Sequence, residues 1–234
     1  AQVRIPKIIH QIWVGPKPFP EQYKVWQQTW QALGWEYHLW TDTEVANFHL
    51  VNRALYEQET NYGAKADILR IEILNQIGGL YVDVDFECLQ PDRFEALNCS
   101  YDFYCGITPL DCKSLVLNNA LIGSIPGHPI LRGIIHELPY LYKFIEDTNM
   151  IWSDVILLKG PGLLTKMFID HSGQGCRDIA FPPTYFYPLG VFQSKNQKLS
   201  HTLLADYFFK EVKSLVKKSE SLAIHWWEGS WIAT

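Results

Sequence analysis

The chain has 234 residues, of which 47% are hydrophobic, and a formal net charge of -5. This length fits one domain with a substantial buried core. The acidic balance argues against a nucleic-acid-binding protein, because such proteins usually present a basic face. The five cysteines form no Cys-x-x-Cys pair, which argues against a zinc knuckle and against a full disulfide framework. No apolar run is long enough to cross a membrane as a helix.

The first part of the chain alternates predicted strands and helices. A nearly continuous apolar strand is predicted over 7–14, and Gly15-Pro16 ends it. A helix over 21–32 and a strand over 35–40 follow, with Thr41-Asp42 as the start of another helix. This alternation is typical of an α/β nucleotide-binding layer. The region has neither a Gly-x-Gly-x-x-Gly motif nor a Walker loop, so a glycine-rich turn is not the predicted phosphate-binding device.

The clearest helix is predicted over 62–77. Its apolar residues recur at helical spacing on more than one face, and Gly78-Gly79 ends it. Asp67 and Arg70 are three residues apart and are therefore neighbours on this helix. An ion pair on a helix surface is the ordinary interpretation of such a pair. An arginine held beside a diphosphate-binding site is the functional one.

An acidic segment follows this helix directly. Leu80, Val82 and Val84 predict a short buried strand, and Asp83 and Asp85 then point to the same side of the extended chain. Two neighbouring carboxylates repel each other, and a hard divalent cation such as Mg2+ or Mn2+ removes that repulsion. A solvated acidic turn is the ordinary interpretation of an isolated Asp-x-Asp. The adjacent Asp/Arg helix favours metal-assisted handling of a diphosphate.

The second part of the chain carries weaker signals. The predicted elements are a strand over 101–107, a segment over 115–124 that contains Asn118-Asn119-Ala120, helices from His128-Pro129 through Glu137 and from Pro161-Gly162 through Ile169, an aromatic strand region over 181–187, and a solvated basic helix face over 210–218. A last strand leads to His225 and two tryptophans. Histidine is a common metal ligand, but a lone histidine beside two tryptophans is more often half-buried and structural.

Three segments together resemble the family 32 glycosyltransferases, whose sugar-binding region contains an Asp-x-Asp motif. They are Ile-Pro-Lys-Ile-Ile-His-Gln-Ile-Trp at 5–13, Ala66–Arg70 leading to Gly78–Asp85, and the tail over 225–231. The glucosylating domains of large clostridial toxins share the Asp/Arg helix and the acidic strand. The resemblance implies an α/β GT-A fold, with a Rossmann-like nucleotide-binding half and a mixed central sheet flanked by helices. Within a single domain over 1–234, about 1–107 would bind the nucleotide sugar, and about 108–234 would bind the acceptor and supply a closing tail.

The resemblance also implies roles for individual residues. The expected metal ligands are Asp83, Asp85 and His225. The expected donor-binding residues are Trp13, Asp67, Arg70, Tyr81, Asp83, Ser230 and Trp231. The expected catalytic residues are Asp67, Arg70, Asp83, Asp85 and Asn119, with Asn119 as the candidate for a group beneath the sugar ring.

The implied activity is a metal-dependent, retaining transfer of a hexose, with Mn2+ or Mg2+ as cofactor. The donor would be UDP-glucose, UDP-galactose or GDP-mannose, and the acceptor a saccharide or glycolipid hydroxyl in polysaccharide or glycolipid synthesis. Three alternatives stay open, namely a toxin-like enzyme that modifies a host protein, a haloacid-dehalogenase-like phosphatase and a non-catalytic sugar-binding module. We expect a cytoplasmic enzyme of bacterial or viral origin, free or bound at a membrane surface, unless the sequence is a piece trimmed of an anchor.

Overall fold

A six-stranded mixed sheet forms the centre of the molecule. The computed structural model describes residues 2–109, 111, 115–194 and 205–229. The strands are β1 (Ile8–Ile12), β2 (Glu36–Trp40), β3 (Gly79–Val82), β5 (Phe103–Ile107), β6 (Leu117–Ser124) and β7 (Asp178–Phe181), in the order β2-β1-β3-β6-β5-β7. Strand β6 runs antiparallel to both of its neighbours, and the other pairs are parallel. The predicted α/β class with a mixed sheet is therefore confirmed.

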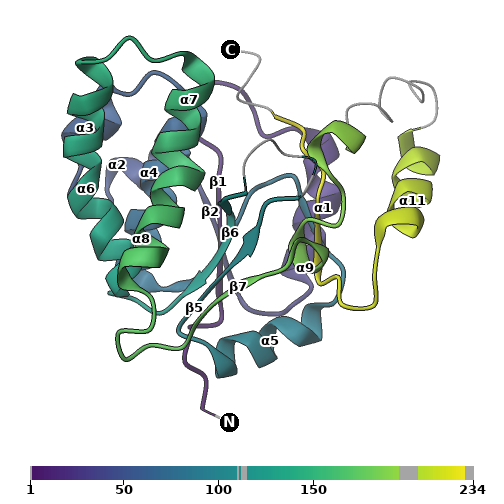
Figure 1. Ribbon diagram of the computed structural model, residues 1–234. Helices are drawn as coiled ribbons and strands as arrows, with labels where there is room; N and C mark the ends of the chain where they lie inside the picture. Colours follow the sequence, from purple (N-terminus) through teal and green to yellow (C-terminus); the bar gives the residue numbers. More distant parts are fainter. Residues whose placement is uncertain (1, 110, 112–114, 195–204, 230–234) are drawn as a thin grey trace.

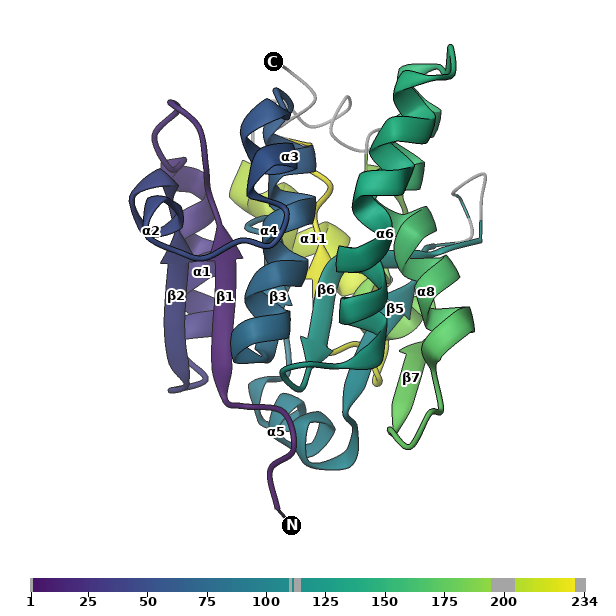
Figure 2. The ribbon, with the colours of Figure 1, turned by 90° about the vertical axis from the view of Figure 1, so that its left-hand side faces the viewer.

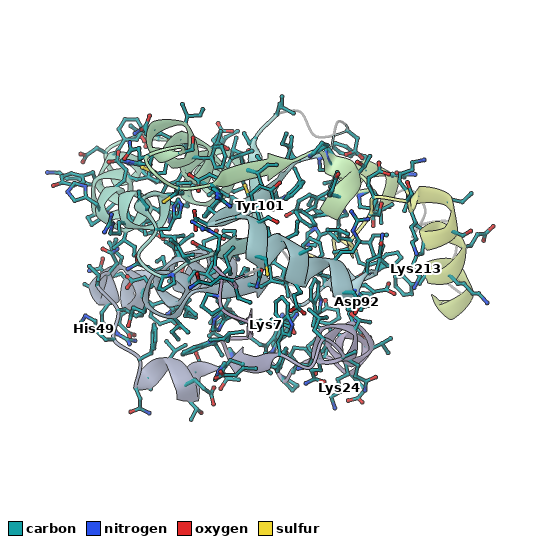
Figure 3. All side chains as sticks on the ribbon, turned by 90° about the horizontal axis from the view of Figure 1, so that it is seen from below. Lys7, Lys24, His49, Asp92, Tyr101 and Lys213 are labelled. Carbon is teal, nitrogen blue, oxygen red and sulfur yellow. The ribbon has the colours of Figure 1, made fainter. Side chains whose placement is uncertain are left out.

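Helices cover both faces of this sheet (Figures 1 and 2). Helices α4 (Tyr62–Ile77), α6 (Pro129–Glu146) and α8 (Leu163–His171) cover one face, and α1 (Lys24–Gln31), α9 (Pro183–Phe186) and α11 (Ala205–Val216) lie on the other side. Helix α5 (Pro91–Ser100) crosses the lower end (Figure 3). The remaining elements are η1 (Glu21–Tyr23), α2 (Asp42–Ala46), α3 (Arg53–Gln58), α7 (Trp152–Leu157), the π-helix η2 (Leu158–Gly162), and the pair β4 (Phe86–Cys88) and β8 (Ala223–His225).

The side chains of β3 alternate between two hydrophobic clusters. Leu80 and Val82 pack into the cluster that contains Trp30, whereas Tyr81 faces the cluster beneath α4 and α6. All four residues of β3 are buried, and Leu80, Tyr81 and Val82 have at most 2% of their surface exposed. A strand covered on both faces is expected to be apolar throughout. This burial fixes β3, and the acidic segment begins at its end.

The turn from α4 into β3 is held by His10 and by a glycine. The Nε2 atom of His10 lies 2.9 Å from the carbonyl oxygen of Gly78, and its Nδ1 accepts a hydrogen bond from the indole of Trp40 at 3.1 Å. Burial lowers the pKa of His10 to about 4, so the ring is neutral. Gly79 has φ +112°, and an added Cβ would lie 2.5 Å from the carbonyl oxygen of Ile8. Only glycine fits there.

Several predicted elements agree with the structure, and three differ. Helix α4 spans the predicted residues, and Thr41 caps α2 with a capping box. Helix α6 continues past Glu137 to Glu146. Pro161 lies inside η2 instead of opening a helix, and the aromatic region over 181–187 is a strand end followed by the short helix α9. Proline at the first position of α9 is compatible with a helix start, which the strand prediction ignored.

The predicted basic helix face lies on α11, at the edge of the molecule (Figure 3). Lys210, Lys217 and Lys218 are exposed, whereas Lys213 forms an ion pair with Glu87. The face is therefore largely solvated, as predicted. Among the described residues, no helix is both long and apolar enough to span a bilayer.

Candidate active site

The two aspartates lie on a turn between β3 and β4. Strand β3 ends at Val82, the amide of Asp83 donates to the carbonyl oxygen of Ala120 at 2.8 Å, and the amide of Phe86 donates back to Asp83 at 3.2 Å. The prediction of an extended chain through Val84 was therefore wrong. Val84 is buried in a separate hydrophobic cluster, and its burial helps to fix the turn.

His225 reaches this turn because β8 pairs with β4. The pairing is antiparallel and places His225 opposite Phe86. The Nε2 atom of His225 lies 2.9 Å from Oδ1 of Asp85 and 3.9 Å from Oδ2 of Asp83. These three side chains thus place one nitrogen and two carboxylates within 4.8 Å of one another. The structure brings together the three predicted metal ligands, although 140 residues separate His225 from Asp85.

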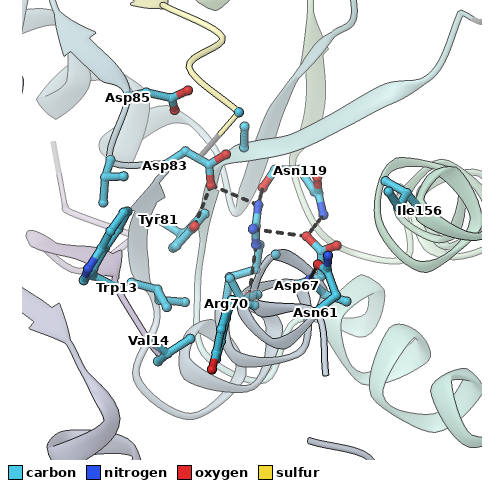
Figure 4. Close-up of a pocket in the computed structure, with 18 of the residues that line it drawn as sticks. Trp13, Val14, Asn61, Asp67, Arg70, Tyr81, Asp83, Asp85, Asn119 and Ile156 are labelled. Atoms are coloured by element: carbon cyan, nitrogen blue, oxygen red, sulfur yellow. Dashed lines mark hydrogen bonds and ion pairs between the residues drawn. The ribbon is translucent and has the colours of Figure 1, made fainter. Parts of the chain in front are cut away.

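Arg70 lies beside the acidic turn and bridges two carboxylates (Figure 4). Its guanidinium contacts Oδ1 of Asp67 at 3.1 Å and Oδ1 of Asp83 at 3.2 Å, and donates to the carbonyl oxygen of Asn119 at 2.8 Å. The guanidinium also lies over the ring of Tyr81, 4.5 Å from its centroid. The Arg70 side chain is only 6% exposed. The surface ion pair considered from sequence is therefore a buried network.

Asn119 and Gly160 contact the other side of Asp67. The amide Nδ2 of Asn119 donates to Oδ1 of Asp67 at 2.8 Å. An added Cβ at Gly160 would lie 3.0 Å from that amide and 3.1 Å from Oδ2 of Asp67, so the backbone of η2 packs closely against both side chains. A π-helical turn often occurs at a functional site.

These side chains line one pocket with a volume of about 430 Å3 (Figure 4). Its size is within the usual range for small-molecule sites. Trp13 forms part of the wall, with its indole nitrogen donating to the carbonyl oxygen of Lys17 at 2.7 Å. Tyr81 lies deeper and donates its hydroxyl to Oδ1 of Asp83 at 2.6 Å. The predicted residues Ser230 and Trp231 lie outside the described part of the chain, whereas Gly229 lines the pocket.

The pKa values of the carboxylates diverge. Burial raises the pKa of Asp67 to about 6, although Arg70 opposes that rise. Burial also raises the pKa of Asp83, with Asp85 adding to the rise and Arg70 opposing it. For Asp85, the effect of His225 and of hydrogen bonds exceeds that of burial, and the pKa is lowered. Three carboxylates therefore share one permanent cation, Arg70, which leaves an excess of negative charge.

The donor set fits a divalent cation. Within the described residues, the Nδ1 atom of His225 is buried without a hydrogen-bond partner. If Nδ1 carries the proton, the lone pair of Nε2 faces the carboxylate of Asp85, which is unfavourable unless a cation lies between them. Carboxylates suit Mg2+ and Mn2+, and imidazole suits the transition metals. Asp83, Asp85 and His225 could therefore hold a divalent cation.

A second group of possible ligands does not fit a metal. His128, Cys176 and Asp178 also lie together. The Nδ1 atom of His128 accepts from the amide of Ile130, so the proton of the neutral ring is on Nε2, which donates to Asp178 at 2.8 Å. A protonated nitrogen cannot ligate a metal. Burial also raises the pKa of Cys176. This group caps α6 and ties it to β7.

Sequence reasoning missed Lys159. The ammonium group of Lys159 lines the pocket and lies 2.8 Å from Oε2 of Glu59, which also accepts from Tyr142 at 2.8 Å. The side chains of Lys159 and Glu59 are 14% and 8% exposed. The pair joins η2 to the segment before α4, and its partners are 100 residues apart. No local pattern could have identified it.

Residues 18–103 match the family model described as "Glycosyltransferase sugar-binding region containing DXD motif". Inositol phosphoceramide mannosyltransferase 2 of Schizosaccharomyces pombe is 28% identical over 203 residues, which cover 84% of this chain and 54% of that protein. A glycosyltransferase of Acanthamoeba polyphaga mimivirus is 27% identical over 204 residues, covering 82% of this chain and 76% of that protein. The chain thus spans about half the length of the yeast relative.

The catalytic domain of alpha-toxin from Clostridium novyi has a similar fold, with a TM-score of 0.54 and 10% identity over all of this chain and 80% of that one. The predicted resemblance to the glycosyltransferases with a DXD motif and the GT-A fold are therefore confirmed, and this fold is shared with a clostridial toxin domain. The match of residues 18–103 is to a sugar-binding region of glycosyltransferases, and the relatives named above are named as glycosyltransferases or mannosyltransferases.

Proposed function

We propose that this chain transfers a hexose from a nucleotide sugar to an acceptor hydroxyl, because residues 18–103 match the sugar-binding region of the glycosyltransferases with a DXD motif and the fold is GT-A. One observation supports this function above all others. Asp83, Asp85 and His225 converge at one side of the pocket, and Arg70 lies directly beside them. Such a pairing of cation ligands and a guanidinium suits a diphosphate leaving group.

Cleavage of the bond between sugar and phosphate would place negative charge on the leaving diphosphate and positive charge on the sugar ring, and the site has groups that suit each charge. A divalent cation held by Asp83, Asp85 and His225 would neutralise the charge that develops on the leaving diphosphate, a contribution of several kcal/mol. Arg70 adds a fixed positive charge on the same side. Since Arg70 is held by two carboxylates and a backbone carbonyl, it needs little reorganisation when that charge develops.

Other residues that line the pocket would bind the sugar and the base. The carboxylate of Asp67 is the acceptor for sugar hydroxyls, and Asn119 fixes its orientation. Asn119 also lines the pocket, where the dipole of its side-chain carbonyl can stabilise positive charge on the sugar ring. The indole of Trp13 offers a flat wall for the nucleobase. Tyr81 holds Asp83 in place through its hydroxyl.

We propose transfer with retention at the anomeric carbon. The acceptor hydroxyl would attack from the face that the diphosphate leaves, and the leaving phosphate would take its proton. A 1H NMR spectrum of the product gives the anomeric configuration, and an inverted product would refute this part of the proposal. The donor would be GDP-mannose, UDP-glucose or UDP-galactose, and we would screen GDP-mannose first because the yeast relative is named a mannosyltransferase.

The acceptor we propose is a glycolipid or saccharide. The yeast relative is named for inositol phosphoceramide, a lipid that carries a polyol headgroup. Inositol phosphoceramide, neutral glycolipids, free saccharides and a denatured protein extract would form the acceptor panel. With a donor labelled in its sugar, transfer of the label to the protein extract alone would support the toxin-like alternative. The cytoplasmic location, with contact at a membrane surface, stays a prediction.

Hydrolysis of nucleotide sugars tests the function directly. Release of GDP or UDP from each donor would be measured with Mn2+ present and after chelation, for the parent chain, Asp85→Asn and Asp147→Asn. Asp147 is an exposed carboxylate at the end of α6 and serves as the matched control. We expect metal-dependent release from one donor, lost in Asp85→Asn and kept in Asp147→Asn. No turnover and no donor binding with any metal would refute the proposal.

A further inference from the structure

Trp227 has a backbone conformation that is costly for its residue type. Its φ is 56°, and among the described residues it is the sole non-glycine residue with a positive φ. This left-handed conformation is unfavourable for an L residue, because it brings the Cβ atom too close to the following carbonyl oxygen. Residues held in this way often occur at functional sites, where surrounding contacts fix them. Trp227 follows His225 by two positions and lines the pocket.

Three contacts hold the Trp227 ring. Its indole nitrogen donates to the carbonyl oxygen of Leu189 at 2.8 Å. The ring packs at 4.1 Å, edge to face, against His225 and at 5.9 Å against Tyr187, measured between ring centroids. These contacts come from two separate segments, the loop after α9 and the end of β8. These contacts hold the Trp227 side chain in place at the left-handed turn of the backbone.

The turn at Trp227 directs two amides onto one residue. The amide of Trp226 donates to the backbone carbonyl of Asp85 at 2.9 Å, and the amide of Glu228 donates to its carboxylate Oδ2 at 2.9 Å. Amides two residues apart are separated by roughly 6.6 Å in an extended strand. The left-handed residue between them lets both bonds reach Asp85. The second carboxylate oxygen, Oδ1, is then left facing His225.

We infer that Trp227 is a positioning residue, whose left-handed turn orients the carboxylate of Asp85 for cation binding. Partners that fix a ligating carboxylate from behind commonly contribute to metal affinity. The inference rests on the proposed metal-dependent function, since it assigns Asp85 to the cation. It adds that the cation affinity depends on the backbone conformation of a residue that does not itself ligate.

A pair of substitutions separates the turn from the ring. Trp227→Gly and Trp227→Ala both remove the indole and its three contacts, but only glycine adopts the left-handed conformation at no steric cost. We expect both variants to bind Mn2+ more weakly than the parent. We also expect Trp227→Ala to bind Mn2+ more weakly than Trp227→Gly, by roughly 5- to 30-fold if the full left-handed cost appears in binding. Free Mn2+ would be measured by electron paramagnetic resonance during titration of the full chain.

Two further measurements make the result decisive. Urea unfolding of each variant reports the stability cost separately, and Trp227→Phe keeps a ring against His225 and Tyr187 while losing only the indole donor. We expect Trp227→Phe to bind Mn2+ more tightly than Trp227→Ala. Equal Mn2+ affinities of the glycine and alanine variants, with only their stabilities different, would assign Trp227 a purely structural role and overturn the inference.

The outcomes also distinguish the inference from the proposed function. A parent chain that binds Mn2+ with the expected order of variants, but neither binds nor hydrolyses any nucleotide sugar, would refute the function and keep the positioning role. A parent chain that binds no Mn2+ would overturn the metal assignment and the inference with it. Turnover by the parent with equal affinities of the glycine and alanine variants would overturn the inference alone.

Discussion

Replacement of Arg70 by methionine tests the charge balance of the site. Methionine keeps much of the apolar stem but removes the guanidinium from between Asp67 and Asp83, which it contacts at 3.1 and 3.2 Å. Breaking a buried ion pair by removal of one partner costs about 3–5 kcal/mol, because the remaining charge is buried and uncompensated. Burial already raises the pKa of Asp67 to about 6, and Arg70 is the stronger of the two groups, with Asn119, that oppose a further rise.

The loss of stability should therefore depend on pH. Without Arg70, the pKa of Asp67 in the folded state rises further above its unfolded value, so the folded state retains a proton that the unfolded state releases. Stability then falls as pH increases from about 4 towards the folded pKa. We expect Arg70→Met to lose about 3–5 kcal/mol at pH 8 and clearly less at pH 5.

Urea unfolding followed by tryptophan fluorescence measures this loss at both pH values. Arg93→Met, on the exposed side of α5, is the matched control and should change stability by less than about 0.5 kcal/mol. The double variant Arg70→Met with Asp67→Asn should recover part of the loss, because one buried charge is removed. A loss below about 1 kcal/mol at pH 8, or an equal loss at both pH values, would refute the reasoning.

Three further predictions concern stability and reactivity. Burial lowers the pKa of His10 to about 4, so on acidification the unfolded state binds a proton before the folded state does. Between pH 7 and pH 4 the parent should therefore lose about 3 kcal/mol more free energy of unfolding than His10→Gln, as urea unfolding would show. Gly123→Ala would place a Cβ 2.2 Å from the buried ring of Tyr104 and should cost at least about 1–3 kcal/mol; an unchanged urea midpoint would contradict this. Burial raises the pKa of Cys88 to about 12, so iodoacetamide should alkylate it only after unfolding, as mass spectrometry of its peptide would show.

The elements with strong local signals could be predicted from sequence. Helix α4 has both a regular apolar period and a glycine stop, and its predicted bounds agree with the structure. The acidic residues and Arg70 were identified because their residue types and spacing are unusual next to a buried strand. The predicted extended conformation at Val84 was wrong. The hydrophobic alternation continues through the turn, because Val84 is buried there in a different hydrophobic cluster from the residues of β3.

The parts that depend on distant contacts could not be predicted. Lys159 is a neighbour of Glu59 only after α6 and η2 have packed against α4, and lysine is usually a surface residue. Trp227 shows the same limit for backbone geometry. Its neighbours in sequence suggest an aromatic strand end, and nothing in residue type predicts a left-handed tryptophan, since glycine and asparagine are the usual residues there.

The arrangement of strands shows why the site depends on the whole chain. Strand β6, from the predicted acceptor half, lies between β3 and β5, which both come from the predicted donor half. Asn119 on β6 therefore reaches Asp67 and Arg70 from within the same sheet. Gly160 then closes on Asp67 from η2. The two predicted halves differ in the ligand each would bind, but they share one sheet and the same hydrophobic clusters, so both sides of the pocket depend on both halves.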